Sequence, residues 1–578
     1  MQKKQAILVV ASLLVVVLGV TLAYFTAQII GKGKSVTINS ADLKIIFTDS
    51  DGSISGTNIE PGKWNVTKTF TIENKSNETY KYNIVIQNLV NTFVTKGYLQ
   101  YKITSTNGGY NMAVFKDIPK SSVAKDSILA YSASIDVGIT QTYTIEFKYA
   151  NDESVDQSDD MGKTLSGKLF ITEGTEEPTL LSQILKDNPR RSTRTTFTAF
   201  TEINTGILYK ATEQIGTNPV KDVYYFAGDA KNNWIKFGKT TEGSCTYKGK
   251  DVLFVNMTDQ IQKYPENETK CTSTNICDVN KNGLYAVGLT ESECSGISGA
   301  KWTTEKATWN GTSTKDIYWR IIRTNADESI KLLYAGTSPD TTSGYIGTSK
   351  FNTKYNDPMY VGYKYGTTGS LENNRLNTND STIKTYVDNW YKNNLISYTK
   401  YLSNDAVYCN DRSLGSGQTY STTNDFAYAS WERIDTNKQP TYNCTNMSDA
   451  FSVNNTSAKL DYPVGLMTID ELSYAGGESF NYYLNASYAW YHTNANGKSI
   501  TGGAGSWALS PSYWLDSDLS VWVWGLSSPD GLIDLIRQSL DSGFVVRPVL
   551  SLKSCIKYST GNGTPETPYE IVETDTSC

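Results

Sequence analysis

The stretch from Gly503 to Lys553, GAGSWALSPSYWLDSDLSVWVWGLSSPDGLIDLIRQSLDSGFVVRPVLSLK, carries the most specific pattern in the chain. Large rings are interleaved with Ser, Gly and Asp, and the stretch closes on an apolar strand signal at 544–552. Rings give contact area at low rotamer entropy and small polar residues give adaptable hydrogen bonds, as in recognition surfaces. The alternative is that the tryptophans form a core, because Trp is well buried on average. The pattern predicts a display region with the ligand-binding residues Trp507, Tyr513, Trp514, Trp522 and Trp524.

Length and composition place this stretch in a large exported protein. A chain of 578 residues is too long for one core, so two or three large domains are expected. The 39 tyrosines and 12 tryptophans stand beside a single histidine and only 19% charged residues, which is typical of a β-rich extracellular protein. A net charge of -6 offers no basic surface for a phosphate backbone, so no nucleic-acid partner is expected.

The cysteines predict disulfides. All eight follow residue 240, and their even number suits an oxidising compartment. There is no CxxC pair, and one histidine cannot complete a repeated ligand set, so we expect no zinc and no other cofactor. Cys409 with Cys444 and Cys555 with Cys578 are the natural pairs. Four more should staple a loop-rich insert at 245–294 in a connectivity that the sequence leaves open: Cys245, Cys271, Cys277 and Cys294.

The amino-terminal residues 1–30 predict export. Lys3 and Lys4 precede an apolar run at 6–25 that is long enough to span a bilayer. The same run has the parts of a signal peptide, with cleavage expected after Ala23. A signal peptide and a transmembrane anchor therefore both remain open, and in either case the rest of the chain is expected to be extracellular, at the cell surface.

Residues 35–172 show a strand pattern. Runs of period two at 36–38, 43–47, 68–72, 80–86, 101–103, 143–147 and 165–171 are separated by Gly, Asn, Ser and Pro turns. Short alternating runs between turn signals are typical of a β-sandwich. The region contains no cysteine and no histidine.

The same region resembles the TasA/camelysin family of exported bacterial matrix proteins. The resemblance rests on LAYFT at 22–26, SADL at 40–43, IEPG at 59–62 and FTIEN at 70–74, and covers roughly residues 10 to 170. It implies a jelly-roll-like sandwich, cleavage near Ala23, and self-association, because some members of the family form surface fibres.

Residues 173–217 predict a linker with a short helix. Leu180, Leu181, Ile184 and Leu185 have helical spacing, which Asn188-Pro189 ends. An α+β module is expected over 218–578. Its signals include two hairpins, 223–226 with 234–237 and 318–323 with 330–334, a helix over 381–396 and a capping box of Thr468 with Glu471.

This module resembles a surface-protein domain of gut Firmicutes and related bacteria. The residues that carry the resemblance are YWRII at 318–322 with IKLLY at 330–334, DNWY at 388–391, YPVGLMT at 462–468 and VRPV at 546–549. An aromatic stretch ending in Val-Arg-Pro is also similar in outline to C-type-lectin-like folds of the sulfatase-modifying-factor kind. The expected class is mainly β with α+β: an amino-terminal jelly-roll-like sandwich and a carboxy-terminal lectin-like module.

No catalytic residue is expected. A nucleophile needs an activating base, and His492, the single histidine, is expected to be a satisfied surface residue. The sequence has no Gly-x-Ser-x-Gly elbow and no Walker loop. We expect an adhesin-like binding protein, not an enzyme, for a host or bacterial surface glycan or protein. The alternatives are a structural biofilm-matrix or fibre subunit and a carbohydrate-active enzyme using loop carboxylates among Asp516, Asp518, Asp530, Asp534 and Asp541.

Overall fold

The computed structural model describes residues 35–38, 43–47, 52–56, 59–95, 97–200, 206–257, 261–265, 267–279, 284–479, 484–485, 489–527, 532–573 and 578. The predicted signal peptide or anchor at 1–30 lies outside the described residues. Among the helices that are described, none has the length and apolar character required to cross a membrane. The chain is mainly β and divides into two compact units, Met1–Glu177 and Pro178–Cys578.

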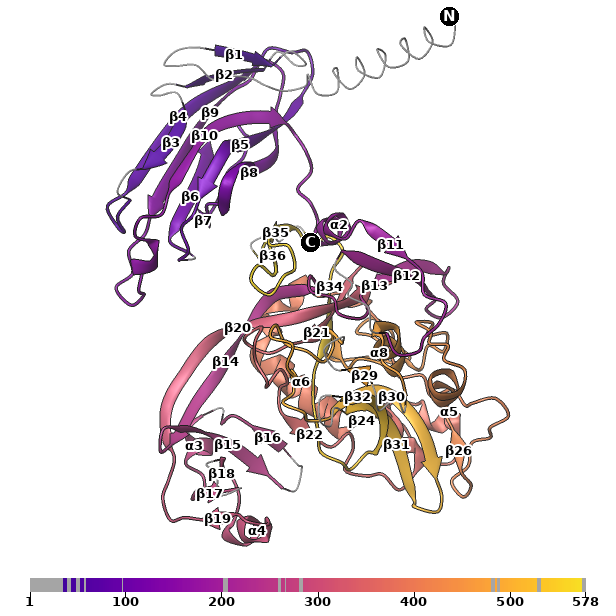
Figure 1. Ribbon diagram of the computed structural model, residues 1–578. Helices are drawn as coiled ribbons and strands as arrows, with labels where there is room; N and C mark the ends of the chain where they lie inside the picture. The colour runs from indigo at the N-terminus through magenta and orange to yellow at the C-terminus, as the bar shows by residue number, and fades with distance from the viewer. Residues whose placement is uncertain are drawn as a thin grey trace, which may run out of the picture. The chain divides into compact units, whose positions relative to one another are not determined.

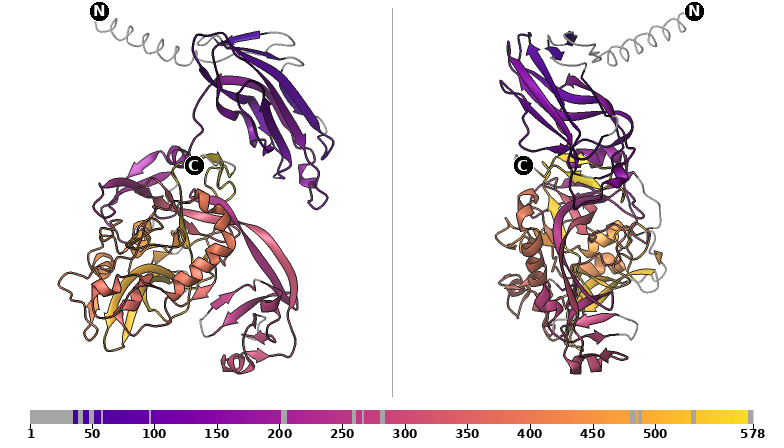
Figure 2. Two further views of the ribbon diagram at one scale, coloured as in Figure 1. Left: turned by 180° about the vertical axis from the view of Figure 1, so that it is seen from behind. Right: turned by 90° about the vertical axis from the view of Figure 1, so that its left-hand side faces the viewer.

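The first unit consists of strands arranged in two antiparallel sheets (Figure 1, Figure 2). One sheet has the order β1-β2-β4-β9-β6-β7 and the other β3-β10-β5-β8. All seven runs expected from the alternation are strands here. The elements are β1 Ser35–Ile38, β2 Leu43–Phe47, β3 Ser53–Gly56, β4 Asn65–Asn74, β5 Tyr80–Asn91, β6 Leu99–Ser105, β7 Lys116–Asp117, β8 Ser121–Ile135, β9 Thr140–Tyr149, the short turn η1 Ser158–Asp160, and β10 Leu165–Glu173.

Alternation along these strands produces the core of the first unit. In β9, Tyr143, Ile145 and Phe147 are fully buried and the residues between them are half-buried. They share one hydrophobic cluster with residues of the other sheet, such as Ile84 in β5 and Leu169 in β10. Burial of one face against the other sheet is therefore what holds the two sheets of this unit together.

The second unit contains the remaining strands and nearly all of the helices. The strands are β11 Arg190–Ser192, β12 Ile207–Glu213, β13 Lys221–Tyr225, β14 Trp234–Tyr247, β15 Lys250–Asn256, β16 Ile261–Lys263, β17 Cys277–Asp278, β18 Tyr285–Val287, β19 Lys301–Trp302, β20 Thr308–Thr324, β21 Ile330–Tyr334, β22 Thr348–Ser349, β23 Lys364–Tyr365, β24 Asn379–Asp380, β25 Tyr408–Cys409, β26 Phe426–Ala427, β27 Ala450–Phe451, β28 Val464–Gly465, β29 Leu484–Asn485, β30 Ser506–Leu515, β31 Ser520–Ser527, β32 Leu532–Ser539, β33 Phe544–Val545, β34 Val549–Leu552, β35 Tyr558–Thr560 and β36 Tyr569–Ile571. The helices are α2 Leu180–Asp187, α3 Glu268–Cys271, α4 Glu291–Gly296, α5 Leu371–Asn374, α6 Thr382–Asn394, α7 Ala429–Trp431 and α8 Ile469–Ala475, with the short turns η2 Pro358–Val361, η3 Ile396–Tyr401 and η4 Glu432–Thr436.

The longest strand, β20, organises the second unit. It pairs with β13, β14 and β21, and β21 continues the sheet to β34. The hairpin expected from 318–323 and 330–334 is present as β20 and β21. The hairpin expected from 223–226 and 234–237 is wrong, because β13 and β14 each pair with β20 and not with each other.

The expected linker at 173–217 differs from what the structure describes, because the units divide after Glu177. The short helix is present as α2, and its Leu180 and Ile184 are buried in the large core of the second unit. Further along, β12 pairs with β13 over five residue pairs. These contacts make residues 178–217 part of the second unit.

The cysteine-rich insert lies at the end of a two-stranded ribbon. Figure 1 shows β14 and β20 extending from the body of the unit to the small strands and helices between them. Two disulfides, Cys245–Cys271 and Cys277–Cys294, staple this insert. Each disulfide belongs to a separate small hydrophobic cluster, so the insert is held by cross-links more than by a large core of its own.

Candidate functional site

The predicted ligand-binding stretch forms the centre of a sheet with the order β22-β33-β30-β31-β32-β29. In the hairpin of β30 and β31, Tyr513 is opposite Trp522 and Trp514 is opposite Val521. Successive side chains of a strand point to opposite faces, so Tyr513 and Trp522 share one face and Trp514 lies on the other. The rings of Tyr513 and Trp522 stack with centroids 5.5 Å apart.

Three of the five predicted ligand residues lie in the core. Trp507, Trp514 and Trp524 are 3%, 1% and 0% exposed. The Nε1 of Trp507 donates to the Ser349 carbonyl at 2.8 Å, and that of Trp524 donates to Ser430 Oγ at 3.1 Å. The structure thus places these three indoles in the core, where the alternative interpretation expected them, although Trp514 also lines the pocket described below.

The remaining two predicted residues, Tyr513 and Trp522, are half-buried and join a larger aromatic group. Trp431 of α7 stacks over Trp524 with centroids 6.0 Å apart, and it meets Tyr513 edge-on at 5.7 Å. The guanidinium of Arg537, on β32, lies 3.8 Å from the ring centroid of Trp431 and 4.9 Å from that of Tyr513. Rings and cation therefore form one packed platform.

Three members of this platform, Trp431, Tyr513 and Arg537, line a cavity of about 370 Å³, which we call the aromatic pocket; Trp522 does not line it. A volume of this size lies at the lower end of the range for small-ligand sites. Residues from four separate strands and helices contribute to its lining, among them Asp425, Phe426, Trp431, Tyr513, Trp514 and Arg537.

The polar groups of the aromatic pocket suit recognition of hydroxyl and carbonyl groups. Asp425 accepts a hydrogen bond from the Asp516 amide at 2.7 Å, and Gln418 accepts one from the Ala427 amide at 3.2 Å. The NH₂ group of the Gln418 side chain and the guanidinium of Arg537 add N–H donors to the lining. Burial raises the pKa of Tyr513 although Arg537 acts in the opposite direction, so the phenol is a neutral donor at neutral pH.

The loop carboxylates considered for glycan cleavage lie elsewhere. Asp530 is outside the described residues. Of the others, Asp516, Asp518, Asp534 and Asp541 do not line the aromatic pocket, and Asp534 is buried. The structure brings no pair of them together in this pocket.

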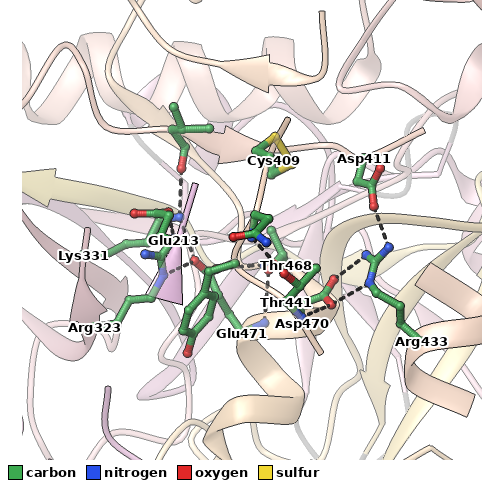
Figure 3. Close-up of a pocket in the computed structure, with 14 residues that line it drawn as sticks. Glu213, Arg323, Lys331, Cys409, Asp411, Arg433, Thr441, Thr468, Asp470 and Glu471 are labelled. Atoms are coloured by element: carbon green, nitrogen blue, oxygen red, sulfur yellow. Dashed lines mark hydrogen bonds and ion pairs between the residues drawn. A yellow bond between two sulfur atoms is a disulfide. The ribbon is translucent and has the colours of Figure 1, made fainter. Parts of the chain in front are cut away.

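A second polar cluster lies inside the unit and is shown in Figure 3. Arg323 bridges two carboxylates, Glu213 at 2.9 Å and Glu471 at 3.0 Å, and Lys331 reaches the same oxygen of Glu471 at 2.7 Å. All four side chains are at most 3% exposed. Burial alone would raise the pKa of Glu471, but the Lys331 and Arg323 charges lower it to about 2.

This ionic cluster is structural. The cavity beside it measures about 20 Å³, which is room for about one water molecule. Glu471 was expected only to cap α8, and it does so by accepting from the Thr468 amide at 3.0 Å. Its second oxygen binds the buried cations, so one carboxylate joins a helix start to the central sheet.

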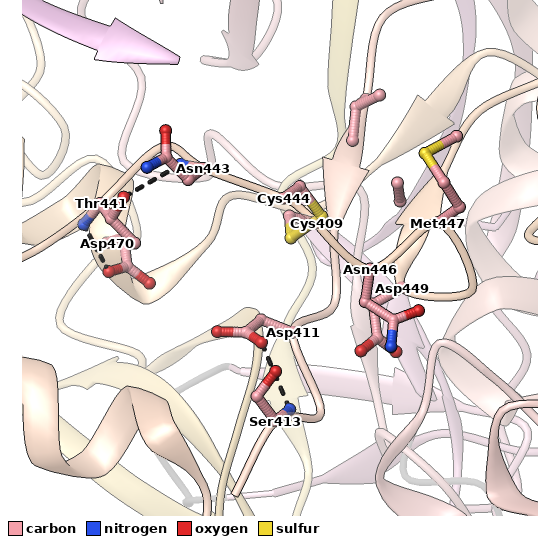
Figure 4. Close-up of a disulfide and its surroundings, with 12 residues drawn as sticks. Cys409, Asp411, Ser413, Thr441, Asn443, Cys444, Asn446, Met447, Asp449 and Asp470 are labelled. Atoms are coloured by element: carbon pink, nitrogen blue, oxygen red, sulfur yellow. Dashed lines mark hydrogen bonds between the residues drawn. A yellow bond between two sulfur atoms is a disulfide. The ribbon is translucent and has the colours of Figure 1, made fainter. Parts of the chain in front are cut away.

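The Cys409–Cys444 disulfide borders the same cavity. Figure 4 shows it with Asp411, Thr441 and Asp470 nearby. The two expected pairs, Cys409 with Cys444 and Cys555 with Cys578, are confirmed, and no cysteine is free. Four disulfides are typical of an extracellular or secreted protein.

One carboxylate cluster has the spacing of a cation site. Oxygens of Asp380, Asp388 and Asp461 all lie within 4.8 Å of one another. The ammonium of Lys384 lies 2.5 to 3.1 Å from each of them and takes the central position that a metal ion would take. Burial raises the pKa of Asp388 to about 6, against the lowering effect of Lys384. This cluster ties the start of α6 to the segment before β28.

His492 corrects another expectation. It is 1% exposed and not a surface residue, and neither ring nitrogen has a hydrogen-bond partner among the described residues. Burial and the nearby Arg547 charge lower its pKa to about 4, so the imidazole is neutral at physiological pH.

Sequence reasoning missed Trp431 and Arg537. Arg537 lies within the quoted stretch, but nothing in its local pattern separates it from a solvated strand residue. Trp431 lies in α7, about 80 residues before Tyr513 in the sequence. Only the pairing of β26, which precedes α7, with β30 brings the two segments together. A contact between distant segments leaves no periodic signal in one sequence.

Comparisons with known proteins add little. No family model matches the sequence, and no curated protein matches it. Two chains of solved structures match; one is a Paenibacillus xanthan lyase, with 9% identity and a TM-score of 0.14. That alignment covers 50% of this chain and 26% of the lyase chain.

Proposed function

We propose that this chain is an exported cell-surface binding protein that holds a glycan or protein ligand in the aromatic pocket. The observation that carries the proposal is the convergence of Trp431, Tyr513 and Arg537 on one cavity of about 370 Å³. Aromatic faces stack on sugar rings or fill partner pockets, and Trp, Tyr and Arg dominate binding hot spots. The remaining lining groups supply hydrogen bonds that orient a ligand.

The proposal extends to the architecture around the pocket. Four disulfides support export, with residues 1–30 as signal peptide or membrane anchor. We take the first unit as a TasA/camelysin-like, jelly-roll-like sandwich that serves as a stalk, and the second as a C-type-lectin-like module that carries the pocket. Attachment to the surface would present the pocket to host or bacterial partners.

A structural fibre subunit is the second candidate, and one observation favours it. Strand β8 is at the edge of its sheet, pairs only with β5, and exposes Val123 by 70%. An exposed edge strand offers unpaired backbone groups to a strand of another copy. Electron microscopy of the purified protein tests this candidate, since fibres that disappear when Val123 is replaced by Pro would support it.

A glycan and surface-protein array tests the binding proposal. Wild type is compared with Tyr513→Ala and Arg537→Gln, and Phe115→Ala is the matched control, because Phe115 is a half-buried ring under the ammonium of Lys148 in the other unit. Each pocket variant should weaken binding by roughly 2 kcal/mol, as truncated hot-spot anchors do. Circular dichroism verifies folding. A folded pocket variant that binds every array ligand as wild type does would refute the assignment of the pocket.

A further inference from the structure

A second cavity, which we call the insert cleft, lies where the cysteine-rich insert meets the body of the second unit. Its volume is about 440 Å³. One wall comes from β14, β15 and β20, and the other comes from the end of β21 and the segment that follows it. It shares no lining residue with the aromatic pocket.

Carboxylates outnumber cations in this cleft. The cleft is lined by Glu242 on β14 and Asp251 on β15, and by one lysine, Lys315 on β20. Within the described part of the chain, none of the three makes an ion pair or a side-chain hydrogen bond. This sets them apart from Glu213 and Glu471, which are fully engaged by buried cations. The fold therefore leaves both carboxylates of the cleft available to a ligand.

A tyrosine that is almost fully buried lines the same cleft. Tyr334 is 4% exposed, and its ring is held edge-on by Trp319 at 5.5 Å and Trp390 at 5.4 Å. It lines the cleft, and its hydroxyl has no hydrogen-bond partner among the described residues. A hydroxyl at the end of a buried ring that meets only the cleft can bond there to a ligand or to ordered water.

Electrostatic effects indicate that these groups face one another. Burial and the charge of Glu242 both raise the pKa of Tyr334. Burial, Asp251, Tyr345 and Glu242 raise the pKa of Tyr264. Both carboxylates therefore act on phenols within one cleft, and the negative potential that opposes phenolate formation would favour a bound cation.

We propose that the insert cleft binds a ligand that carries an ammonium group, with Glu242 and Asp251 as its counter-charges. Ammonium donors form strong charge-assisted hydrogen bonds to carboxylates. The rings of Tyr264 and Tyr345 provide faces for the cation, and the hydroxyl of Tyr334 provides a further acceptor. Amino sugars and polyamines share this chemistry.

The wall of the cleft is fixed before any ligand arrives. A Cβ atom at Gly243 would lie 2.0 Å from the Pro265 carbonyl oxygen, so only glycine lets β14 approach the segment that carries Tyr264. The neighbouring Cys245–Cys271 disulfide ties the ribbon to α3. A wall that is already ordered reduces the entropic cost of binding.

Isothermal calorimetry with the purified protein tests the proposal. The probes are a tetramer of glucosamine, its fully N-acetylated form, which has the same ring framework without the charges, and spermidine. We expect the glucosamine tetramer to bind, the N-acetylated tetramer to bind at least tenfold more weakly, and added salt to weaken binding. Binding of spermidine would assign a general ammonium site, and its failure to bind would assign an amino-sugar site.

A matched pair of variants locates the site. Glu242→Gln with Asp251→Asn should weaken ammonium binding at least tenfold. Glu268→Gln with Glu291→Gln removes the same charge from exposed positions on the same insert and should leave binding unchanged. Thermal unfolding checks that both variants are folded. Equal loss in the two variants, no loss in the cleft variant, equal binding of the N-acetylated tetramer, or no binding of either ammonium probe would overturn the proposal, and the aromatic pocket would be untouched.

Discussion

Protonation of His492 should destabilise the second unit in acid. The imidazole is buried beside Arg547, which lowers its pKa from 6.5 to about 4. The unfolded chain therefore takes up this proton more readily than the folded protein does. The stability that the neutral ring contributes is fully present above pH 6.5 and is lost as the pH falls toward 4.

The magnitude follows from that interval. Each pH unit between the two pKa values changes the free energy of unfolding by about 1.4 kcal/mol. Between pH 7 and pH 4, His492 should thus remove roughly 3 kcal/mol of stability. Glu471, whose pKa is lowered to about 2, titrates below this window. Asp388, whose pKa is raised to about 6, has the opposite sign, because its contribution is lost as the pH rises.

Urea unfolding of wild type and His492→Phe at pH 7, 6, 5 and 4 measures the effect. Trp64 is the single tryptophan of the first unit, so fluorescence from the other eleven of the 12 reports on the second. Any packing penalty of the larger phenyl ring is independent of pH, so it shifts the plot of unfolding free energy against pH without changing its shape. The other titrating groups are the same in both proteins. The two curves should converge by about 3 kcal/mol toward pH 4. Parallel curves would refute the reasoning.

Three further predictions concern stability and are measured by thermal or urea unfolding. Trp524→Ala should cost about 3–5 kcal/mol because the indole is fully buried, whereas the half-buried Trp522 should cost about 1–2 kcal/mol when truncated; equal effects would contradict this difference in burial. Glu471→Gln should cost about 3–5 kcal/mol because two buried cations lose their counter-charge, and a neutral result would show that they are compensated otherwise. Replacing Cys409 and Cys444 by Ser should cost about 4 kcal/mol, since their bond closes a separation of 35 residues; an unchanged midpoint would contradict this.

The elements were predictable where local chemistry decides them. Period-two alternation marked the strands of the first unit, because each strand buries one face, as Tyr143 and Ile145 do in β9. The start of α6 was predictable from Ser381, whose side chain accepts a hydrogen bond from the Lys384 amide. Such signals lie within a few residues of the structure that they specify.

Contacts between distant segments were not predictable. The strands β13 and β14 are neighbours in sequence and read as a hairpin, but β20, about 85 residues later, lies between them. The aromatic pocket was not predictable for the same reason, because Trp431 and Tyr513 come from segments about 80 residues apart. The burial of each tryptophan was not predictable either. Composition identified the stretch, but only packing against Trp431 of α7 distinguishes the fully buried Trp524 from the half-buried Trp522.

Two of the motifs that carried the second resemblance contribute buried arginines that bond backbone carbonyls. None of these motifs lines the aromatic pocket. Arg320 from 318–322 donates to the carbonyls of Ala230 and Thr493, and Arg547 from 546–549 donates to those of Tyr334 and Tyr491. Both guanidiniums are buried, and their planar donor sets satisfy carbonyls that irregular segments leave unpaired.

The two proposed sites use residues outside those motifs, except for Tyr334 of the 330–334 motif, which lines the insert cleft. Tyr513 and Arg537 occupy strand faces where the fold requires only β structure, and Glu242 and Asp251 stand on a ribbon that is anchored at the body by β20. We therefore propose that the buried arginines belong to the supporting frame and that ligand specificity is set at the two proposed sites.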